Sequence, residues 1–450
     1  MLAVLLLMAA SAGAQDWIRT GTGLGMEKVR LAVPDFVATS AEGQTGELLR
    51  TFNDTLWNDL QQAGIFDMVS KSFYPIGSFN GPAAIKLDAW GNPPPNAGMV
   101  AFGNLGITTP QQAKSGLAGG PVNGGRLLVQ GWLYDAKNQQ SPQVLGKQYN
   151  EAAAQQSARV IAHRFANEII LRLGGGLPGI AESRIYFVST RSGNKEVWAM
   201  DYDGANQQQL THLRSLALSP HLSPDGSRVA LAGIWHGDWN VLMYSNDLNR
   251  LVSFPVFGGG NLSPAWSGDG TKLAFSSSRG GSPEIYSCDA NGGNLKRLTA
   301  GKGPDVSPVW NPKTGVQIAF VSGRSGLPQI YVMDSDGSNV QRVTDTGYAV
   351  SPSWSPNGQF LLFSWIRHYG PGAPGGDDIY IMDIASHHWV QLTHNSGRND
   401  FPSWSPDGRH IVFQSSRGGS EQIWTMLADG SQQRQLTSAA ANSQPNWGSR

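Results

Sequence analysis

Apolar and polar residues in the C-terminal half of the chain repeat with a nearly fixed period. One large apolar residue marks each repeat, at Leu222, Trp266, Trp310, Trp354, Trp404 and Trp447. The markers are separated by 44, 44, 44, 50 and 43 residues. A period in this range is typical of propellers, solenoids and other repeat arrays.

The repeat at residues 262–299 predicts four short strands separated by turns. The expected strands cover residues 264–267, 272–276, 284–289 and 296–299. Gly-Asp-Gly at 268–270 and Asn-Gly-Gly at 291–293 supply the positive φ angles that tight turns require. Four strands in about 44 residues form one propeller blade, whereas helical repeats need a helix-length apolar period that is absent here.

The second strand of each repeat gives an independent count. Its apolar run begins at Ile185, Val229, Leu273, Ile318, Leu361 and Ile411, which predicts six blades. The array starts with a second strand and ends with a lone first strand at residues 444–447. We therefore expect the last strand to pair with the first blade and to close the ring.

The pattern before the repeats is different and predicts a mixed α/β domain. Strands are expected at residues 29–36, 65–70, 126–134 and 143–149, and amphipathic helices at 47–63 and 157–173. Apolar residues recur along both helices at the 3.6-residue period. We assign residues 27–173 to this α/β domain, 174–183 to a linker and 184–450 to the propeller.

The first 26 residues lack the pattern of a folded domain. Residues 1–14 combine an apolar run with Ala12-Gly13-Ala14, which is typical of an export signal cleaved before Gln15. The run is too short to span a membrane, and no basic residue precedes Arg19. The alternative is a buried N-terminal strand or helix. Residues 15–26 contain few apolar side chains and predict an extended arm.

The composition of the chain argues against several classes of function. The chain of 450 residues has 33 Lys plus Arg and 33 Asp plus Glu, so its charge favours neither nucleic acid nor an anionic membrane. Its 56 Gly and 26 Pro residues fit a turn-rich β protein. Cys288 is the single cysteine, which excludes an internal disulfide.

A search for catalytic and metal-binding motifs finds none that is complete. Nucleophile elbow, zinc-protease, phosphate-loop and paired-cysteine motifs are absent. His387-His388 is better explained as a solvated hairpin tip than as a metal ligand pair. Residues 201–204 and 334–337 resemble fragments of calcium loops, but they lack the final Glu and fall at hairpin turns. We predict no catalytic, cofactor or metal site.

Four arginines recur at one point of the blade and raise the question of a cationic site. They are Arg191, Arg279, Arg324 and Arg417. Recurrence at one place in each repeat indicates shared architecture rather than four catalytic cations. The recurring Trp and Phe positions are interpreted in the same way, as core between the blades.

Two groups of residues carry a resemblance to a known family. Leu-Ser-Pro-Asp-Gly at 222–226, Trp-Ser-Pro-Asn-Gly at 354–358 and Trp-Ser-Pro-Asp-Gly at 404–408, each followed by an apolar strand, resemble the repeat of the TolB family. Residues 157–169 and 184–189 are similar to that family's last α/β helix and first blade. The order of signal, α/β domain, helix and six blades extends the resemblance to nearly the whole chain.

The resemblance implies a non-enzymatic periplasmic adaptor of the Tol-Pal envelope system. It implies binding of the lipoprotein Pal through the propeller and of TolA through the N-terminal arm, in support of outer-membrane invagination at division and of envelope integrity. Other outer-membrane proteins are further possible partners; nucleic acid and a membrane span are not implied. The alternatives are a secreted propeller enzyme and a polysaccharide-binding propeller.

The loops indicate which face of the propeller binds. Loops between strands one and two, and between three and four, are uniform turns, whereas loops two to three and the crossings between blades vary, as at 367–378. Variable loops on a rigid scaffold commonly carry binding sites. We expect Pal to dock over a channel mouth lined by Leu262, Ser263, Val306, Ser307, Val350, Ser351, Asp400 and Phe401. The alternative is that these positions only begin the inner strands.

The arm supplies the expected contact with TolA. Trp17 and Ile18 are its large apolar residues, and we expect them to anchor it when it is bound. Without a core of its own, the arm should be either mobile or docked as an added segment. A plain linker left by signal cleavage is the alternative.

Overall fold

The computed structural model describes residues 17–19, 21–25, 27–108, 125–366, 376–394 and 396–449. These residues form two compact units. One comprises residues 23–182, and the other contains residues 183–449 together with the described residues before Gly23. The expected export signal at 1–14 lies outside the described residues, as does most of the variable loop at 367–378.

The unit at 23–182 is an α/β domain built on one sheet in the order β3-β1-β4-β5-β6, with β2 beside β4. Its strands are β1 (Val29–Ala32), β2 (Val37–Ala38), β3 (Phe66–Met68), β4 (Met99–Thr108), β5 (Arg126–Asp135) and β6 (Gln143–Ala152). Its helices are α2 (Thr45–Gln62), α3 (Leu87–Gly91) and α4 (Gln155–Leu173), with short 3-10 turns at Lys71–Phe73 and Pro82–Ala84. Strands β4, β5 and β6 are antiparallel, and the other pairs are parallel.

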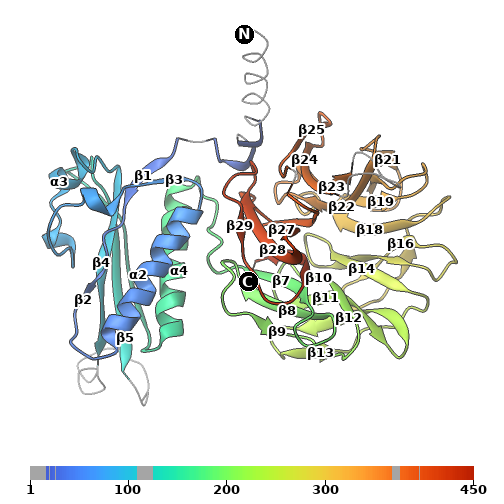
Figure 1. The fold of residues 1–450 in the computed structure, drawn as a ribbon, viewed down its shortest axis with the longest axis horizontal. Coiled ribbons are helices and arrows are strands. Elements are labelled where there is room, and N and C mark those ends of the chain that lie inside the picture. Colours follow the sequence, from blue (N-terminus) through green and yellow to red (C-terminus); the bar gives the residue numbers. More distant parts are fainter. Residues whose placement is uncertain are drawn as a thin grey trace, which may run out of the picture. The chain divides into compact units, whose positions relative to one another are not determined.

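Each face of this sheet has its own apolar core. Helices α2 and α4 cover one face (Figure 1), where Phe52 and Phe165 are fully buried. On the same pair of helices, His163 Nδ1 lies 2.7 Å from Asp59 Oδ2. A second cluster around Trp90 and Phe102 covers the other face. Alternation of side chains along β4 supplies both cores.

The sequence pattern did not reveal β4, although it is central to the sheet. Gly103, Asn104 and Gly106 interrupt its apolar run and hide the alternation. Gly103 is needed here because a Cβ atom would lie 2.1 Å from the carbonyl oxygen of Gln130. The expected strand at 29–36 is also shorter, since β1 ends at Ala32, two residues before Pro34.

The larger unit contains six four-stranded sheets, which confirms the predicted six-bladed propeller. Blade one has β30 (Asn442–Gly448), β7 (Arg184–Ser189), β8 (Glu196–Asp201) and β9 (Gln208–Gln209). Blade two has β10 (Ala217–Leu222), β11 (Arg228–Trp235), β12 (Asp238–Ser245) and β13 (Arg250–Val252). Blade three has β14 (Asn261–Trp266), β15 (Lys272–Ser277), β16 (Glu284–Asp289) and β17 (Lys296–Arg297).

The remaining blades follow the same order from the inner to the outer strand. Blade four has β18 (Asp305–Trp310), β19 (Gln317–Ser322), β20 (Gln329–Asp334) and β21 (Gln341–Arg342). Blade five has β22 (Tyr348–Trp354), β23 (Phe360–Ile366), β24 (Asp378–Asp383) and β25 (His388–Gln391). Blade six has β26 (Asn399–Trp404), β27 (His410–Gly418), β28 (Ser420–Leu427) and β29 (Arg434–Gln435).

Blade one combines the two ends of the repeat array. Its inner strand, β30, pairs antiparallel with β7, with Trp447 opposite Ile185. The indole Nε1 of Trp447 also donates a hydrogen bond to Ser183 Oγ at 2.8 Å. A strand from the last repeat therefore completes the first blade, which leaves no open gap in the ring.

Candidate partner-binding face of the propeller

The channel mouth is framed by one irregular residue on each inner strand. These residues are Ser219, Ser263, Ser307, Ser351, Phe401 and Gln444, and their φ angles lie between 50° and 53°. Each precedes a proline, and the ladder to the second strand shifts register at that point, as between Leu262 and Ala265. Bulges of this kind are common at barrel rims and beside binding sites.

The geometry of these bulges follows from proline chemistry. Proline cannot donate a hydrogen bond to the ladder, so an inner strand accepts it only where pairing is interrupted. A positive φ angle at a residue other than glycine is uncommon and costs free energy. Its repetition six times around one channel indicates that the rigid blades impose a defined shape on the mouth.

The bulges and prolines line a cavity of about 120 Å³ at the mouth. The marker tryptophans, together with Ser267 and Ser405, line a second cavity of about 220 Å³ in the channel. His221 lines both cavities, and its burial lowers its pKa to about 4. Its imidazole is therefore uncharged at neutral pH.

The structure brings together only part of the predicted Pal-binding set. Ser263, Ser307, Ser351 and Phe401 line the mouth cavity. Leu262, Val306, Val350 and Asp400 come one position earlier on their strands and do not line it, although Leu262 is 36% exposed.

Asp400 has an internal role that the sequence did not show. Its Oδ1 accepts hydrogen bonds from Ser351 Oγ at 2.8 Å, Ser364 Oγ at 2.7 Å and the backbone N–H of Phe401 at 2.6 Å. Burial raises the pKa of Asp400 despite these bonds. The carboxyl thus fixes the bulge of blade six against blade five instead of facing a partner.

The prediction also left out residues that occupy the same place as its members. Ser219 and Gln444 line the mouth, and the N–H of Ser219 donates to Gln444 Oε1 at 2.8 Å. The prolines that follow each bulge line the cavity as well. All of these residues lie directly before, or at, the proline of an inner strand, and this feature of the sequence could have identified them.

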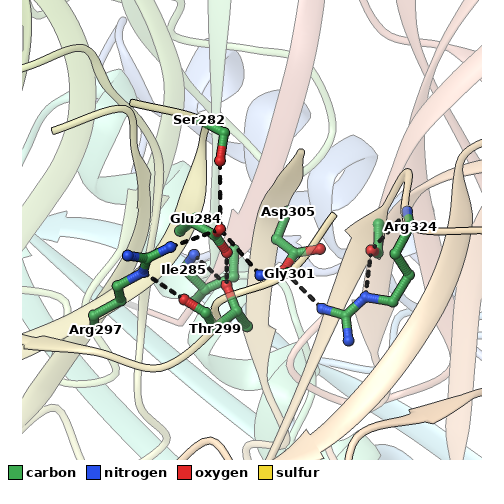
Figure 2. Close-up of polar contacts among 9 residues, drawn as sticks. Ser282, Glu284, Ile285, Arg297, Thr299, Gly301, Asp305 and Arg324 are labelled. Atoms are coloured by element: carbon green, nitrogen blue, oxygen red, sulfur yellow. Dashed lines mark hydrogen bonds and ion pairs between the residues drawn. The ribbon is translucent and has the colours of Figure 1, made fainter. Parts of the chain in front are cut away.

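A polar cluster fixes the crossing from blade three to blade four, which leads to Asp305 at the start of β18 (Figure 2). Glu284 Oε2 accepts from Thr299 Oγ1 at 2.7 Å, and the same threonine oxygen accepts from the N–H of Ile285 at 2.9 Å. Glu284 Oε1 accepts from Arg297 Nη2 at 2.8 Å and from the N–H of Gly301 at 3.3 Å. The crossing is therefore tied to β16 along its length.

Similar threonine bridges recur in four other blades. The acceptors of Thr211, Thr344, Thr393 and Thr437 are Glu196, Gln329, Asp378 and Gln422. Asn399 and Asn442, which begin the next inner strands, donate to the last two of these acceptors. At the junction of blades three and four an acid, Asp305, stands in the place of these asparagines.

Asp305 and Glu284 are both fully buried acids with arginine partners. Arg324 Nη2 donates to Asp305 Oδ2 at 2.7 Å. Burial nevertheless raises the pKa of Asp305. For Glu284, burial acts in the same direction, but the hydrogen bonds from Thr299, Gly301 and Arg297 outweigh it and lower the pKa.

Replacing Asp305 by Asn should change how stability depends on pH. Because the pKa of Asp305 is raised in the folded state, its ionisation costs stability as pH rises through that pKa. Asp305→Asn removes this cost, so its melting temperature relative to the wild type should rise by about 2 °C or more between pH 4 and pH 7. Thermal unfolding at both pH values measures the difference.

Asp269→Asn is the matched control, because hydrogen bonds from Ser267 and Thr271 lower the pKa of Asp269. Its carboxylate contributes stability above the unfolded pKa that is lost as pH falls. The control should therefore lose most stability at pH 7 and less at pH 4. An Asp305→Asn effect that is the same at both pH values contradicts the assigned role.

The recurring arginines support the loops between the second and third strands. Arg191 and Arg417 lie over the rings of Trp198 and Trp424, at 4.9 Å and 4.3 Å from the ring centroids. Arg324 stacks over Tyr331 at 5.1 Å while it pairs with Asp305. These contacts agree with the interpretation that the recurring arginines are part of the structure common to the blades.

The described part of the arm is helical, so the prediction of an extended arm is wrong for these residues. Residues 17–19 and 21–22 have helical conformation, and Thr22 Oγ1 donates to the carbonyl of Ile18 at 2.7 Å. Ile18 is fully buried. The propeller surface, which the sequence pattern of the arm does not reveal, supplies the apolar contacts that order this segment.

The arm packs on blades five and six. The Trp17 ring lies 5.3 Å from that of Phe360 and 5.6 Å from that of His388. Arg19 Nε pairs with Asp429 Oδ2 at 3.2 Å, and Asn357 Nδ2 donates to the carbonyl of Gly21 at 3.1 Å. We call the surface around Asn357, Phe360, Trp404 and Asp429 the arm groove.

Two other segments singled out in the sequence form turns. His387 adopts a φ angle of 57° at its hairpin tip, and Asp336 accepts hydrogen bonds from Ser338 within its turn. Within the described ranges, no group of three or more His, Cys, Asp or Glu side chains could hold a metal ion. None of the helices described has both the length and the apolar character of a membrane span.

Comparison with known proteins matches the propeller to one family. A family model described as the TolB beta propeller domain matches residues 173–368 and 346–450. The chain is 32% identical over 301 residues to the Tol-Pal system protein TolB of Desulfosudis oleivorans, covering 66% of this chain and 64% of that protein. It is 36% identical over 190 residues to a protein TolB homolog of Chlorobium chlorochromatii, covering 42% of each.

These matches span less than two thirds of the length of the two curated relatives. A structural match covers more of the chain. The crystal structure of TolB from Acinetobacter baumannii superposes with a TM-score of 0.75 at 24% identity, covering 94% of this chain and 98% of that one. At this identity the likeness establishes the shared fold.

Proposed function

We propose a function from the premise that this chain belongs to the TolB family, whose propeller model matches more than half of it. The chain acts as a non-enzymatic, periplasmic adaptor of the Tol-Pal system. It binds Pal over the channel mouth and TolA through the N-terminal arm, and so supports outer-membrane invagination and envelope integrity. The Tol-Pal name of the Desulfosudis relative supports this assignment.

The observation that carries the proposal is the ring of six pre-proline bulges at the mouth. It presents backbone and small side chains in fixed positions, as a protein-binding surface requires. The leading mouth contacts are Ser263, Ser307, Ser351 and Phe401. Leu262, Val306 and Val350 flank them, while Asp400 positions the loop.

Capture of purified Pal tests the proposal directly. We expect the immobilised full chain to retain the soluble part of Pal, and free Pal to compete for it. Retention of TolA but not of Pal would leave the mouth without its proposed ligand and would contradict the assignment.

Binding of TolA to the arm requires that the arm be released from the propeller. Trp17 packs on Phe360 of the arm groove and Ile18 is buried, so a partner that binds these two side chains must displace the arm from the propeller. Burial of Ile18 opposes release by roughly 1.5–3 kcal/mol. TolA binding therefore competes with docking of the arm.

Two opposite changes test this competition. Replacing both Trp17 and Ile18 by Ser should abolish TolA capture and leave Pal capture intact, because the anchors are lost but the mouth is not. Phe360→Gln introduces the residue that blade four has at the equivalent position, Gln317. This change should weaken docking of the arm and increase TolA capture. Pull-downs with each partner measure both, and unchanged TolA capture in both variants refutes the role of the arm.

A further inference from the structure

A second groove on the propeller repeats the architecture of the arm groove two blades away. It is a cavity of about 320 Å³ between blades three and four, and we call it the lysine groove. Its lining includes Asp269, Lys272, Trp310, Lys313 and Ser335. We propose that the lysine groove binds a short peptide segment that carries a carboxylate. This inference goes beyond the proposed contacts with Pal and TolA.

The repeat aligns the principal residues of the two grooves. Lys272 and Phe360 begin the second strands of blades three and five. Trp310 and Trp404 end the inner strands of the blades that follow. Both grooves therefore lie at the end of the inner strands away from the bulges, on the face opposite the mouth.

The arm groove shows what this architecture holds. There, the side chain of Asn357 donates to a backbone carbonyl of the arm at 3.1 Å, and an aromatic side chain packs on Phe360. Asp269 occupies the position of Asn357 in the lysine groove. A carboxylate there can accept a peptide N–H where Asn357 donates to a peptide carbonyl.

Two local changes alter the rim of the lysine groove. Gly268 stands where blade five has Pro356, and a Cβ atom at 268 would lie 2.2 Å from the carbonyl oxygen of Pro312. The turn of blade four from Asn311 is also one residue longer than the turn of blade six from Ser405, which brings Lys313 to the rim.

The charges of the lysine groove favour an anionic group. Lys272 and Lys313 are exposed, and neither forms an ion pair with a residue that the structure describes. Asp269 accepts from Ser267 Oγ at 2.6 Å and Thr271 N at 3.1 Å, so its charge is partly satisfied inside its own turn. A carboxylate between the two ammonium groups complements the groove.

The lysine groove and the arm groove differ in the residue that begins the second strand. Phe360 is fully buried beneath the arm, whereas Lys272 is exposed and offers an ammonium group instead of a ring. An aromatic side chain of the ligand can still lie over Lys272 through a cation–π contact. The ligand of the lysine groove therefore differs from the arm in that it is recognised through a carboxylate.

Synthetic peptides that copy residues 17–25, which contain no acidic side chain, and that carry an amidated C-terminus provide the probe. One keeps the natural sequence, and the other carries Arg19→Glu, which replaces the cation of the segment by a carboxylate. Fluorescence anisotropy with the full chain should show binding of the Glu peptide. The double variant Lys272→Glu/Lys313→Glu should weaken that binding by about tenfold or more. The charge-matched control Lys86→Glu/Lys195→Glu should bind as the wild type does.

Several outcomes overturn the proposal. Absence of binding, equal binding to the groove variant, or tighter binding of the unmodified peptide each excludes carboxylate recognition here. If the Lys272→Glu/Lys313→Glu variant no longer binds a chitooligosaccharide probe but still binds the Glu peptide, the cavity is assigned to a glycan instead. Since Pal and TolA are absent from the assay, its result is independent of the proposed adaptor function.

Discussion

Deletion of residues 441–450 is expected to destabilise the whole propeller rather than only to remove one strand from it. β30 is the inner strand of blade one, so its loss exposes the edge of β7 along the channel. It also removes Trp447, which is 6% exposed. Loss of a buried tryptophan alone costs about 3–5 kcal/mol.

The same strand connects blade one to both of its neighbours. The N–H of Trp447 donates to Ser403 Oγ of blade six at 3.0 Å, and Asn446 Oδ1 accepts from the N–H of Leu222 of blade two at 3.0 Å. Its deletion therefore breaks two interfaces as well as one sheet. We expect the melting temperature of the propeller to fall by about 10 °C or more.

Deletion of residues 449–450 is the matched control, because it keeps all of β30. The control should melt with the full chain in a calorimetric scan. If the longer deletion also melts within about 1 °C of the full chain, β30 does not hold the ring together as described.

Substitution of three mouth serines by aspartate should weaken Pal binding by about a hundredfold or more, because three buried like charges at one interface are costly. The variant carries Ser263→Asp, Ser307→Asp and Ser351→Asp. Aspartate tolerates the positive φ angle of these positions, so the bulges can persist. Titration of purified Pal measures the loss, and thermal unfolding verifies that the ring remains folded.

The corresponding triple asparagine variant separates charge from shape. Asparagine also tolerates the positive φ angle but adds no charge, so most of the binding should remain. A double variant at Ser263 and Ser307 avoids the hydrogen bond from Ser351 to Asp400. If these variants bind Pal normally while substitutions in the turns at 223–226 and 405–408 abolish binding, the wrong face has been assigned.

The propeller could be predicted from sequence because its signals are local and repeated. Each blade carries a large apolar marker, usually tryptophan, and turn residues at fixed offsets, so a single weak pattern is read six times. The α/β domain offers no such repetition. Its central strand β4 was missed because Gly103 and Gly106 are explained only by tight packing against residues distant in the sequence, Gln130 and Thr39.

The sequence indicated the position of the channel mouth, but not which side chains line it. Position before a proline indicated the mouth, but only the three-dimensional bulge shows that Ser263 lines it while Leu262 does not. Asp400 resembled an exposed acid in the sequence, yet its partners come from blades five and six. The helical conformation of Ile18 depends on a propeller surface more than 300 residues away in the chain.

Hydrogen exchange of the full chain with and without purified Pal tests whether Pal docks over the channel mouth. We predict added protection of the backbone at residues 261–265, 305–309, 349–353 and 399–403, around the channel mouth. We predict no added protection at the turns 223–226 and 405–408 on the opposite face. Protection confined to those turns or to residues 27–173, with the mouth unchanged, would contradict docking at the mouth.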